Sequence, residues 1–172
     1  MVTEILETAR LKSEYGQLNL QKTDLVKLIR DICITFEGQI PGIRFENVPE
    51  TFQTFVDTEQ IETVLKNLLD NALKYSTVGN APVEICLKKS DAGTLIEIQD
   101  RGPGIQDEEL DLIFEPFYRT DKSRNRKTGG YGLGLSLCKT IIEAHGGTID
   151  VQSNTGKGTM FSLHLPKSTS TI

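Results

Sequence analysis

Three polar residues recur about one helical turn apart within the stretch NLLDNALKYS, namely Asn67, Asn71 and Lys74. Side chains separated by four and three residues lie on one face of an α-helix. Asparagine is a poor residue for a helix interior, so two of them in one helix indicate a purpose other than helix formation. On a helical wheel the three residues form a stripe beside the apolar face, whereas Asp70 faces away. The stripe therefore lies at the edge of a core, where a cleft can form.

Glycine dominates the stretch GGYGLG (129–134), in which four of six residues are glycine. We expect the last of them, Gly134, in the first turn of a helix, where glycine costs up to ~1 kcal/mol relative to alanine. A backbone that must approach a phosphate, with helix N-terminal amides facing the anion, accounts for that cost. A flexible loop that tolerates glycine is the alternative. No strand directly precedes the stretch, as a dinucleotide fingerprint requires, and the nearest Walker-like match, NTGKGT, lacks the earlier glycine.

Positive charge gathers just before these glycines. The segment RTDKSRNRK (119–127) holds five cationic residues and one acidic residue, a formal charge of +4 that leaves −9 for the rest of the chain. Such a run is usually a solvated loop, but beside a glycine-rich helix start in an acidic protein it favours contact with a polyphosphate. Phe114 and Phe117, which flank Pro116, would anchor such a loop as a hinged lid.

A carboxylate ends an apolar strand in the stretch DRGPGI (100–105). A simple turn would explain Asp100 and the glycines that follow it. The functional interpretation is more specific: a buried carboxylate accepts a hydrogen bond from an exocyclic amine, while Gly102 and Gly104 let a flat ring pack against the backbone. Adenine carries such an amine, and guanine does not present one at the same edge.

The elements that position these residues follow from hydrophobic spacing and from helix caps. Asp24 and Asp57 are expected to cap two helices, the second with Gln60 at the third helical position as in a capping box. A third helix is expected at 132–144, ended by a pair of glycines. Alternating apolar residues predict strands at 17–21, 42–48, 53–57, 81–89, 93–100, 148–153 and 158–165, with an antiparallel hairpin at 81–100. This order predicts an α+β fold, a two-layer sandwich whose mixed sheet is covered on one face by helices.

Composition disfavours several classes of protein. The chain has 172 residues, 37% of them hydrophobic and 25% charged, which predicts a soluble globular domain with one core. The net charge of −5 disfavours nucleic-acid binding, which needs a basic face. No apolar run approaches the ~20 residues of a membrane span, and the N-terminus lacks a signal-peptide pattern. The three widely spaced cysteines are interpreted as core residues in a reducing compartment, and no Cys/His pair has the spacing of zinc ligands.

Five stretches stand in one order along the chain: NLLDNALKYS, DRGPGI, FEPFYR, GGYGLGLSL and GTMFSL. Together they resemble the N, G1, F and G2 boxes, and a G3-like strand, of the catalytic ATP-binding domain of sensor histidine kinases. That domain belongs to the wider GHKL superfamily of gyrase, chaperone, mismatch-repair and kinase ATPases. The match spans residues 20–166. It implies the Bergerat-type α/β sandwich, with ATP and Mg²⁺ bound between helices and a lid.

The resemblance implies a role for each matching residue. Asn67, Asn71 and Lys74 would form the catalytic group, and Asn71 would ligate Mg²⁺ through an amide oxygen that adds no negative charge beside a triphosphate. Asp100 would accept a hydrogen bond from the adenine amine. The residues expected to contact the nucleotide are Asn67, Asn71, Lys74, Tyr75, Asp100, Gly102, Gly104, Ile105, Phe117, Arg119, Lys122, Gly130, Tyr131, Gly132, Leu133, Gly134, Leu135 and Thr159.

One position separates the branches of the superfamily. The ATP-hydrolysing members carry a glutamate one turn before the metal-binding asparagine, where it activates water. Asn67 occupies that position here, and an amide cannot act as a general base. The sequence therefore favours transfer of the γ-phosphate to a protein histidine. A GHKL-type ATPase, and a non-catalytic regulatory module that uses nucleotide only to order its lid, are the alternatives.

Neither histidine of the chain has the context of a phosphoacceptor. His145 follows a predicted helix, where a C-terminal capping role is expected, and His164 lies in the last strand. Residues 1–16 resemble the tail of the dimerisation and phosphoacceptor hairpin, 17–166 the catalytic domain, and 167–172 a disordered tail. We expect the hairpin of a full-length homodimer to receive the phosphate and pass it to a response regulator. The expected location is the cytoplasm, either free or as the inner part of a membrane-anchored sensor.

Overall fold

The structure, a computed structural model, describes residues 18–45, 48–76, 81–90, 92–119 and 131–167. Three of the sequence-based predictions lie outside these ranges. They are the hairpin tail at the N-terminus, the part of the predicted lid that holds Lys122 and Gly130, and the C-terminal tail after residue 167.

Five strands form the main sheet, in the order β2-β4-β5-β7-β6. The first pair is parallel and joins β2 (Ile43–Phe45) to β4 (Val83–Ser90). The remaining pairs are antiparallel and add β5 (Gly93–Gln99), β7 (Gly158–Pro166) and β6 (Thr148–Asn154). The predicted hairpin at 81–100 is confirmed as β4 and β5, and the sheet is mixed as expected.

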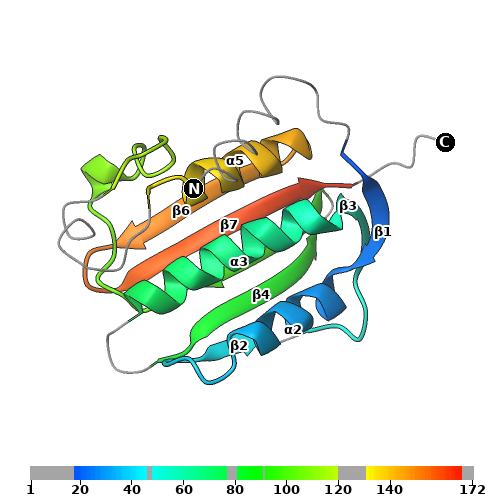
Figure 1. Cartoon of the computed structure of the whole chain (residues 1–172), viewed down its shortest axis with the longest axis horizontal. Helices are drawn as coiled ribbons and strands as arrows, with labels where there is room; N and C mark the ends of the chain where they lie inside the picture. Colours follow the sequence, from blue (N-terminus) through cyan, green and yellow to red (C-terminus); the bar gives the residue numbers. More distant parts are fainter. Residues whose placement is uncertain (1–17, 46–47, 77–80, 91, 120–130, 168–172) are drawn as a thin grey trace.

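Three helices lie over one face of this sheet (Figure 1). They are α2 (Leu25–Thr35), α3 (Thr58–Tyr75) and α5 (Gly134–Ala144), with α3 between the other two. The predicted α+β two-layer sandwich is therefore confirmed. None of the helices in the described part of the chain combines the length and apolar character that a membrane crossing needs.

A second, two-stranded sheet lies beside the main one. It pairs β1 (Leu20–Asp24) antiparallel with β3 (Gln53–Asp57). The strand predicted at 17–21 is therefore displaced toward the C-terminus. The reason is the pairing register, because every residue of β1 is opposite a residue of β3, with Leu20 facing Asp57 and Asp24 facing Gln53.

Both predicted aspartate caps are confirmed. The Asp24 Oδ1 atom accepts from the backbone N–H of Val26 at 3.0 Å, and the Asp57 Oδ1 atom accepts from that of Gln60 at 3.2 Å. Each bond satisfies a helix N–H group that has no partner within the helix. The third helix, expected to start at 132, begins at Gly134 instead. Gly134 lies in its first turn, as predicted.

His145 joins the end of α5 to the start of α3. Its Nδ1 atom lies 2.8 Å from the carbonyl oxygen of Ile141, which confirms the predicted capping role, and its Nε2 atom accepts from the backbone N–H of Asp57 at 3.1 Å. These two bonds fix the neutral tautomer with the proton on Nδ1. Burial lowers the pKa of His145, against smaller raising effects of the Ile141 bond and the Asp57 charge.

The core lies between the helices and the sheet. The face of α3 predicted to be apolar is buried, and β4 alternates buried Val83, Ile85 and Leu87 with more exposed residues. Full burial of each such side chain contributes about 1.5–3 kcal/mol relative to exposure. Because α3 is held by this face, the polar stripe beside it has a fixed direction.

Candidate functional site

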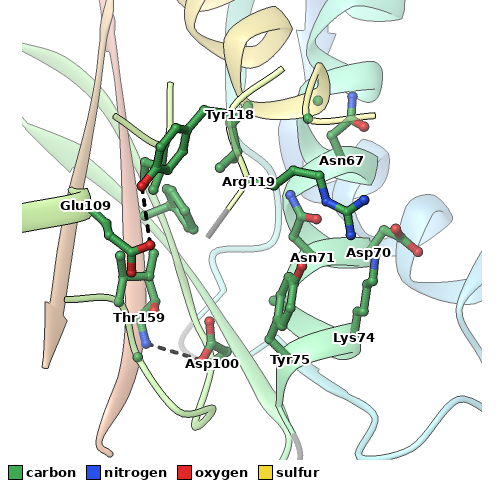
Figure 2. A pocket seen from close by; sticks show the side chains of 18 of the residues that line it. Asn67, Asp70, Asn71, Lys74, Tyr75, Asp100, Glu109, Tyr118, Arg119 and Thr159 are labelled. Atoms are coloured by element: carbon green, nitrogen blue, oxygen red, sulfur yellow. Dashed lines mark hydrogen bonds between the residues drawn. The ribbon is translucent and has the colours of Figure 1, made fainter. Parts of the chain in front are cut away.

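A cavity of about 410 Å³ lies between the C-terminal half of α3, the loops after β5 and the start of α5 (Figure 2). It is enclosed by segments that are far apart in the sequence. The residues that line it are Asn67, Asp70, Asn71, Ala72, Lys74, Tyr75, Asp100, Pro103, Gly104, Ile105, Gln106, Glu109, Ile113, Tyr118, Arg119, Tyr131, Gly132, Leu133, Gly134, Leu135, Thr159 and Phe161.

The polar stripe of α3 forms one wall. Asn67, Asn71 and Lys74 all line the cavity, and the Lys74 Nζ atom lies 5.6 Å from the centre of the Tyr75 ring, a cation–π distance. Asp70 faces away from the apolar side of α3, as predicted. Asp70 is exposed but lies on the rim of the cavity, because it follows Asn67 by three residues and shares the edge of its face.

Asp100 lies at the other end of the cavity, with only 5% of its surface exposed. Its Oδ1 atom accepts from the backbone N–H groups of Gly102, at 2.7 Å, and Thr159, at 3.2 Å. Burial raises the pKa of this carboxyl group, while the two backbone hydrogen bonds oppose the shift. Every fully buried side-chain oxygen in the described part of the chain has a hydrogen-bond partner. Asp100 Oδ2 has none among the described residues, so it is not fully buried and is available to a ligand in the cavity.

The two glycines after Asp100 have different positions. Gly104 lines the cavity with a φ of +69°, and a Cβ atom there would come within 2.3 Å of the Asn154 carbonyl oxygen, so only glycine fits. Gly102 is not among the lining residues. It packs behind the wall, where a Cβ atom would lie 2.5 Å from the Tyr75 carbonyl oxygen.

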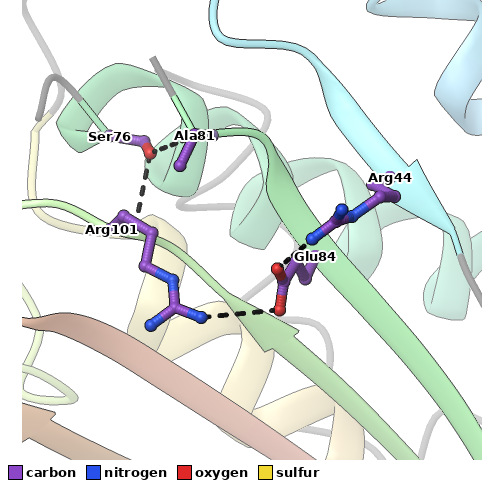
Figure 3. A network of polar contacts seen from close by, with 5 residues as sticks. All are labelled: Arg44, Ser76, Ala81, Glu84 and Arg101. Atoms are coloured by element: carbon purple, nitrogen blue, oxygen red, sulfur yellow. Dashed lines mark hydrogen bonds and ion pairs between the residues drawn. The ribbon is translucent and has the colours of Figure 1, made fainter. Parts of the chain in front are cut away.

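A polar network behind the cavity ties this loop to the sheet (Figure 3). The Arg101 N–H donates to the Ser76 hydroxyl at 3.4 Å, and that hydroxyl donates to the Ala81 carbonyl at 3.5 Å. The Arg101 guanidinium lies 3.8 Å from Glu84, which also pairs with Arg44. Exposed ion pairs contribute only about 0–1 kcal/mol, so the network fixes the position of the loop more than it adds stability.

The two ends of the predicted lid are joined where they leave the domain. The Phe117 N–H donates to the Gly132 carbonyl at 2.9 Å. Phe114 packs edge-on against Phe161 with ring centres 6.3 Å apart, as an anchor should. The predicted anchoring by Phe117 is wrong, because its φ of +67° turns the side chain outward and leaves it 65% exposed. Phe117 is also absent from the cavity lining, although Arg119 is part of it.

The first turn of α5 forms the wall opposite Asp100. Leu133 stands at the N-cap, and its side chain makes no capping hydrogen bond. The first amides of α5 and the positive end of its dipole are therefore open to an anion. A Cβ atom on Gly134 would lie 3.2 Å from the Asn67 Oδ1 atom, so glycine keeps α5 close to the α3 amide. Leu133, Leu135 and Tyr131 complete this side, with Tyr131 60% exposed.

Several lining residues were not predicted from the sequence. Glu109 belongs to a short 3₁₀ helix, η1 (Asp107–Glu109), and its Oε1 atom accepts from the Tyr118 hydroxyl at 3.3 Å (Figure 2). The acidic stretch around it has no pattern that marks one carboxylate. The other unpredicted lining residues are Asp70, Ala72, Pro103, Gln106, Ile113, Tyr118 and Phe161.

The chemistry of the two ends is different. Lys74, Arg119 and the open start of α5 suit a ligand with an anionic part, and Figure 2 shows the Arg119 side chain reaching toward α3. The buried Asp100 carboxylate suits a hydrogen-bond donor. Apolar residues such as Ile105 and Ile113 line the cavity between them. A flat group that carries an amine at one end and phosphates at the other matches this distribution.

The chain matches the family model described as "Histidine kinase-, DNA gyrase B-, and HSP90-like ATPase" over residues 56–169. It belongs to this family, and the resemblance drawn from the five stretches is confirmed. The sensor protein SrrB of Staphylococcus aureus strain MRSA252 is 36% identical over 171 residues, covering 97% of this chain and 29% of that protein. The chain thus spans less than a third of that relative's length.

Solved structures of histidine kinases share the fold. Full-length ShkA in complex with AMPPNP superposes with a TM-score of 0.81 at 26% identity, covering 98% of this chain and 35% of that one. The mycobacterial sensor histidine kinase MprB gives 0.74 at 30% identity, with coverages of 85% and 97%. The catalytic domain of histidine kinase ThkA gives 0.73 at 30%, with coverages of 88% and 99%.

Proposed function

We propose that the chain is the Mg·ATP-binding catalytic domain of a sensor histidine kinase, and that it transfers the γ-phosphate to a histidine on a separate helical hairpin. One observation carries this proposal. A single cavity has the buried Asp100 carboxylate at one end, and the α3 amides, two cationic side chains and an uncapped helix start at the other. The likeness to ShkA, solved with AMPPNP, supports a nucleotide as the ligand.

The chemistry of the two ends of the cavity determines the orientation of the nucleotide. The adenine amine donates to Asp100 Oδ2, and the base packs between the loop at Gly104 and Ile105 and the wall of α3. The phosphates then point toward Lys74, Arg119 and the first turn of α5. Phosphoryl transfer has a loose, highly charged transition state, so these fixed positive groups act mainly by electrostatic stabilisation.

The amides of α3 fit a magnesium ion. Asn67 and Asn71 line the same cavity one turn apart, and the absence of a Cβ atom at Gly134 keeps the start of α5 against Asn67. Within the described ranges no cluster of three or more His, Cys, Asp or Glu side chains could hold a metal alone. Mg²⁺ usually takes one or two protein oxygens together with phosphates and water. Asn71 would hold it, with Asn67 beside it, and the ion would neutralise phosphate charge.

The wider context forms part of the same proposal. The relatives include proteins named as sensor kinases, and the chain covers only part of SrrB. The phosphoacceptor hairpin would belong to the same full-length protein, a homodimer, which relays the phosphate to a response regulator in the cytoplasm.

The decisive experiment supplies a phosphoacceptor hairpin from a related kinase in trans, with labelled ATP and Mg²⁺. We expect label on the hairpin histidine, and none after Asn71→Ala. Asn19→Ala, whose side chain is exposed and outside the cavity lining, is the matched control and should leave labelling unchanged. Nucleotide binding without any labelling would favour a regulatory module that binds nucleotide but transfers nothing.

Hydrolysis is the second candidate, because Glu109 lines the cavity in addition to Asp70 and Asp100, and a glutamate is the base of the ATP-hydrolysing members. Its hydrogen bond from Tyr118 and its place across the cavity from α3 make it a poor base for water at the phosphate end (Figure 2). Phosphate release by the chain alone, abolished by Glu109→Gln, would establish the ATPase instead of the kinase.

A further inference from the structure

The hydroxyl of Ser153 lies at the centre of three polar contacts behind the Asp100 end of the cavity. It accepts from the backbone N–H of Ile105 at 2.8 Å and donates to the carbonyl of Gly158 at 3.0 Å. It also lies 2.9 Å from the hydroxyl of Thr159. Ser153 itself is not a lining residue, whereas Ile105 and Thr159 both are.

These contacts determine where the hydroxyl protons point. A serine hydroxyl has one proton to donate and two lone pairs to accept with. The carbonyl of Gly158 can only accept, and the N–H of Ile105 can only donate. All three contacts are hydrogen bonds only if Ser153 donates to Gly158 and accepts from both Ile105 and Thr159. The proton of the Thr159 hydroxyl is therefore directed at Ser153, away from the cavity.

As a result, the cavity wall beside Asp100 presents only hydrogen-bond acceptors to a ligand. Thr159 adjoins Asp100, since its N–H donates to Asp100 Oδ1 and its carbonyl accepts from the Asp100 N–H at 2.9 Å. With its proton directed at Ser153, the Thr159 oxygen presents only lone pairs to a ligand. Its hydroxyl also leaves Asp100 Oδ2 free for the ligand. A donor group such as an amine suits this wall, and a carbonyl oxygen does not.

We propose that Ser153 is a positioning residue that sets base specificity, by holding the Thr159 hydroxyl so that this wall only accepts hydrogen bonds. The inference rests on the proposed function, in which the base of ATP occupies this end of the cavity. Without the Ser153 oxygen, the Thr159 hydroxyl turns freely, donates to a ligand carbonyl or competes for Asp100, and discrimination between bases falls.

The test compares the affinities of the chain for ATP and for inosine triphosphate, in which a carbonyl oxygen replaces the amine. We expect Ser153→Ala to lower the preference for ATP about tenfold, the loss typical of one hydrogen bond in a specific site. Ser153→Thr, which keeps a hydroxyl at this position, should restore the preference. The ratio of affinities is the readout because a purely structural role for Ser153 would weaken both nucleotides equally.

Thr159→Val supplies a second variant, since it removes the hydroxyl that Ser153 is inferred to hold. In that background Ser153→Ala should cause no further change in the ratio. An unchanged ratio in Ser153→Ala, or an additional change in the Thr159→Val background, overturns the inference. A wild-type chain that binds both nucleotides equally, or neither, overturns the proposed function and the inference with it.

Discussion

Replacing Asp100 by asparagine separates nucleotide recognition from folding. The two side chains have the same shape, so the Oδ1 atom of the asparagine keeps the hydrogen bonds from Gly102 and Thr159, which are 2.7 and 3.2 Å long in the native chain. The change falls on the other atom. An NH₂ group replaces Oδ2, so that in the proposed binding mode a donor would face the donor amine of adenine.

The expected loss follows from the burial of this site. Asp100 is 5% exposed, so water cannot substitute for the lost acceptor. A hydrogen bond to a charged group contributes about 1.5–3 kcal/mol, and an unpaired donor at this depth adds to the loss. We therefore expect ATP affinity to fall by about 10- to 150-fold.

The stability of the ligand-free domain should not fall together with the ATP affinity. Burial raises the pKa of Asp100 above the ordinary value of 3.8, so the folded chain holds this proton more firmly than the unfolded chain. Stability gained from the raised pKa is fully present below pH 3.8 and is lost as the pH rises through the folded pKa. At pH 7 the buried charge is thus a cost, and the asparagine variant should melt no lower than the native chain.

Calorimetric titration with a non-hydrolysable ATP analogue and thermal unfolding test the two parts together. Asp31→Asn, at an exposed position on α2 outside the cavity lining, is the matched control and should change neither. Unchanged affinity in Asp100→Asn would show that the base lies elsewhere. A large loss of stability would show that the carboxylate is structural, and either result refutes the reasoning.

Three further predictions concern the frame of the site. Gly132→Ala should destabilise the domain by more than the ~1–3 kcal/mol of a strained backbone and weaken ATP binding, because its Cβ atom would lie 2.6 Å from the Tyr118 carbonyl oxygen. Gly156→Ala, with a φ of +82° and no atom within 4 Å of its Cβ, should show the backbone strain alone in urea unfolding. Burial lowers the pKa of His145 from 6.5, so its contribution to stability is present above pH 6.5 and lost as the pH falls through the folded pKa. Urea unfolding between pH 7.5 and 5 should therefore be less pH-dependent in His145→Gln than in the native chain. Burial raises the pKa of the Cys138 thiol to about 12, so mass spectrometry should find it alkylated only after unfolding.

Local sequence patterns predicted many of the elements that position the site. Asp24 and Asp57 cap their helices as expected, because a cap depends on residues two or three positions away. The apolar face of α3 was also predictable from spacing, and it directs Asn67, Asn71 and Lys74 to the cavity. The α3 residues that we propose to carry the chemistry could thus be predicted from a single helix.

Contacts between distant segments could not be predicted in this way. Asp57 was expected to complete a capping box with Gln60, but its N–H donates to His145, 88 residues later. Glu109 of η1 lines the same cavity as Thr159 and Phe161, about 50 residues later in the chain, and no local spacing indicates that they meet. Phe117 was misjudged for a related reason, since its positive φ follows from the pairing with Gly132.

A force applied to the chain just before β1 would be transmitted to the interior of the domain through Asp57. The Asn19 N–H donates to Asp57 Oδ2 at 3.0 Å, and the Asp57 N–H is held by His145 at the end of α5. Tension at this point is divided between the beginning of one cavity-lining helix and the end of another. Asp57 therefore links the chain before β1 to the beginning of α3 and the end of α5, so a displacement at Asn19 should be felt at both helices.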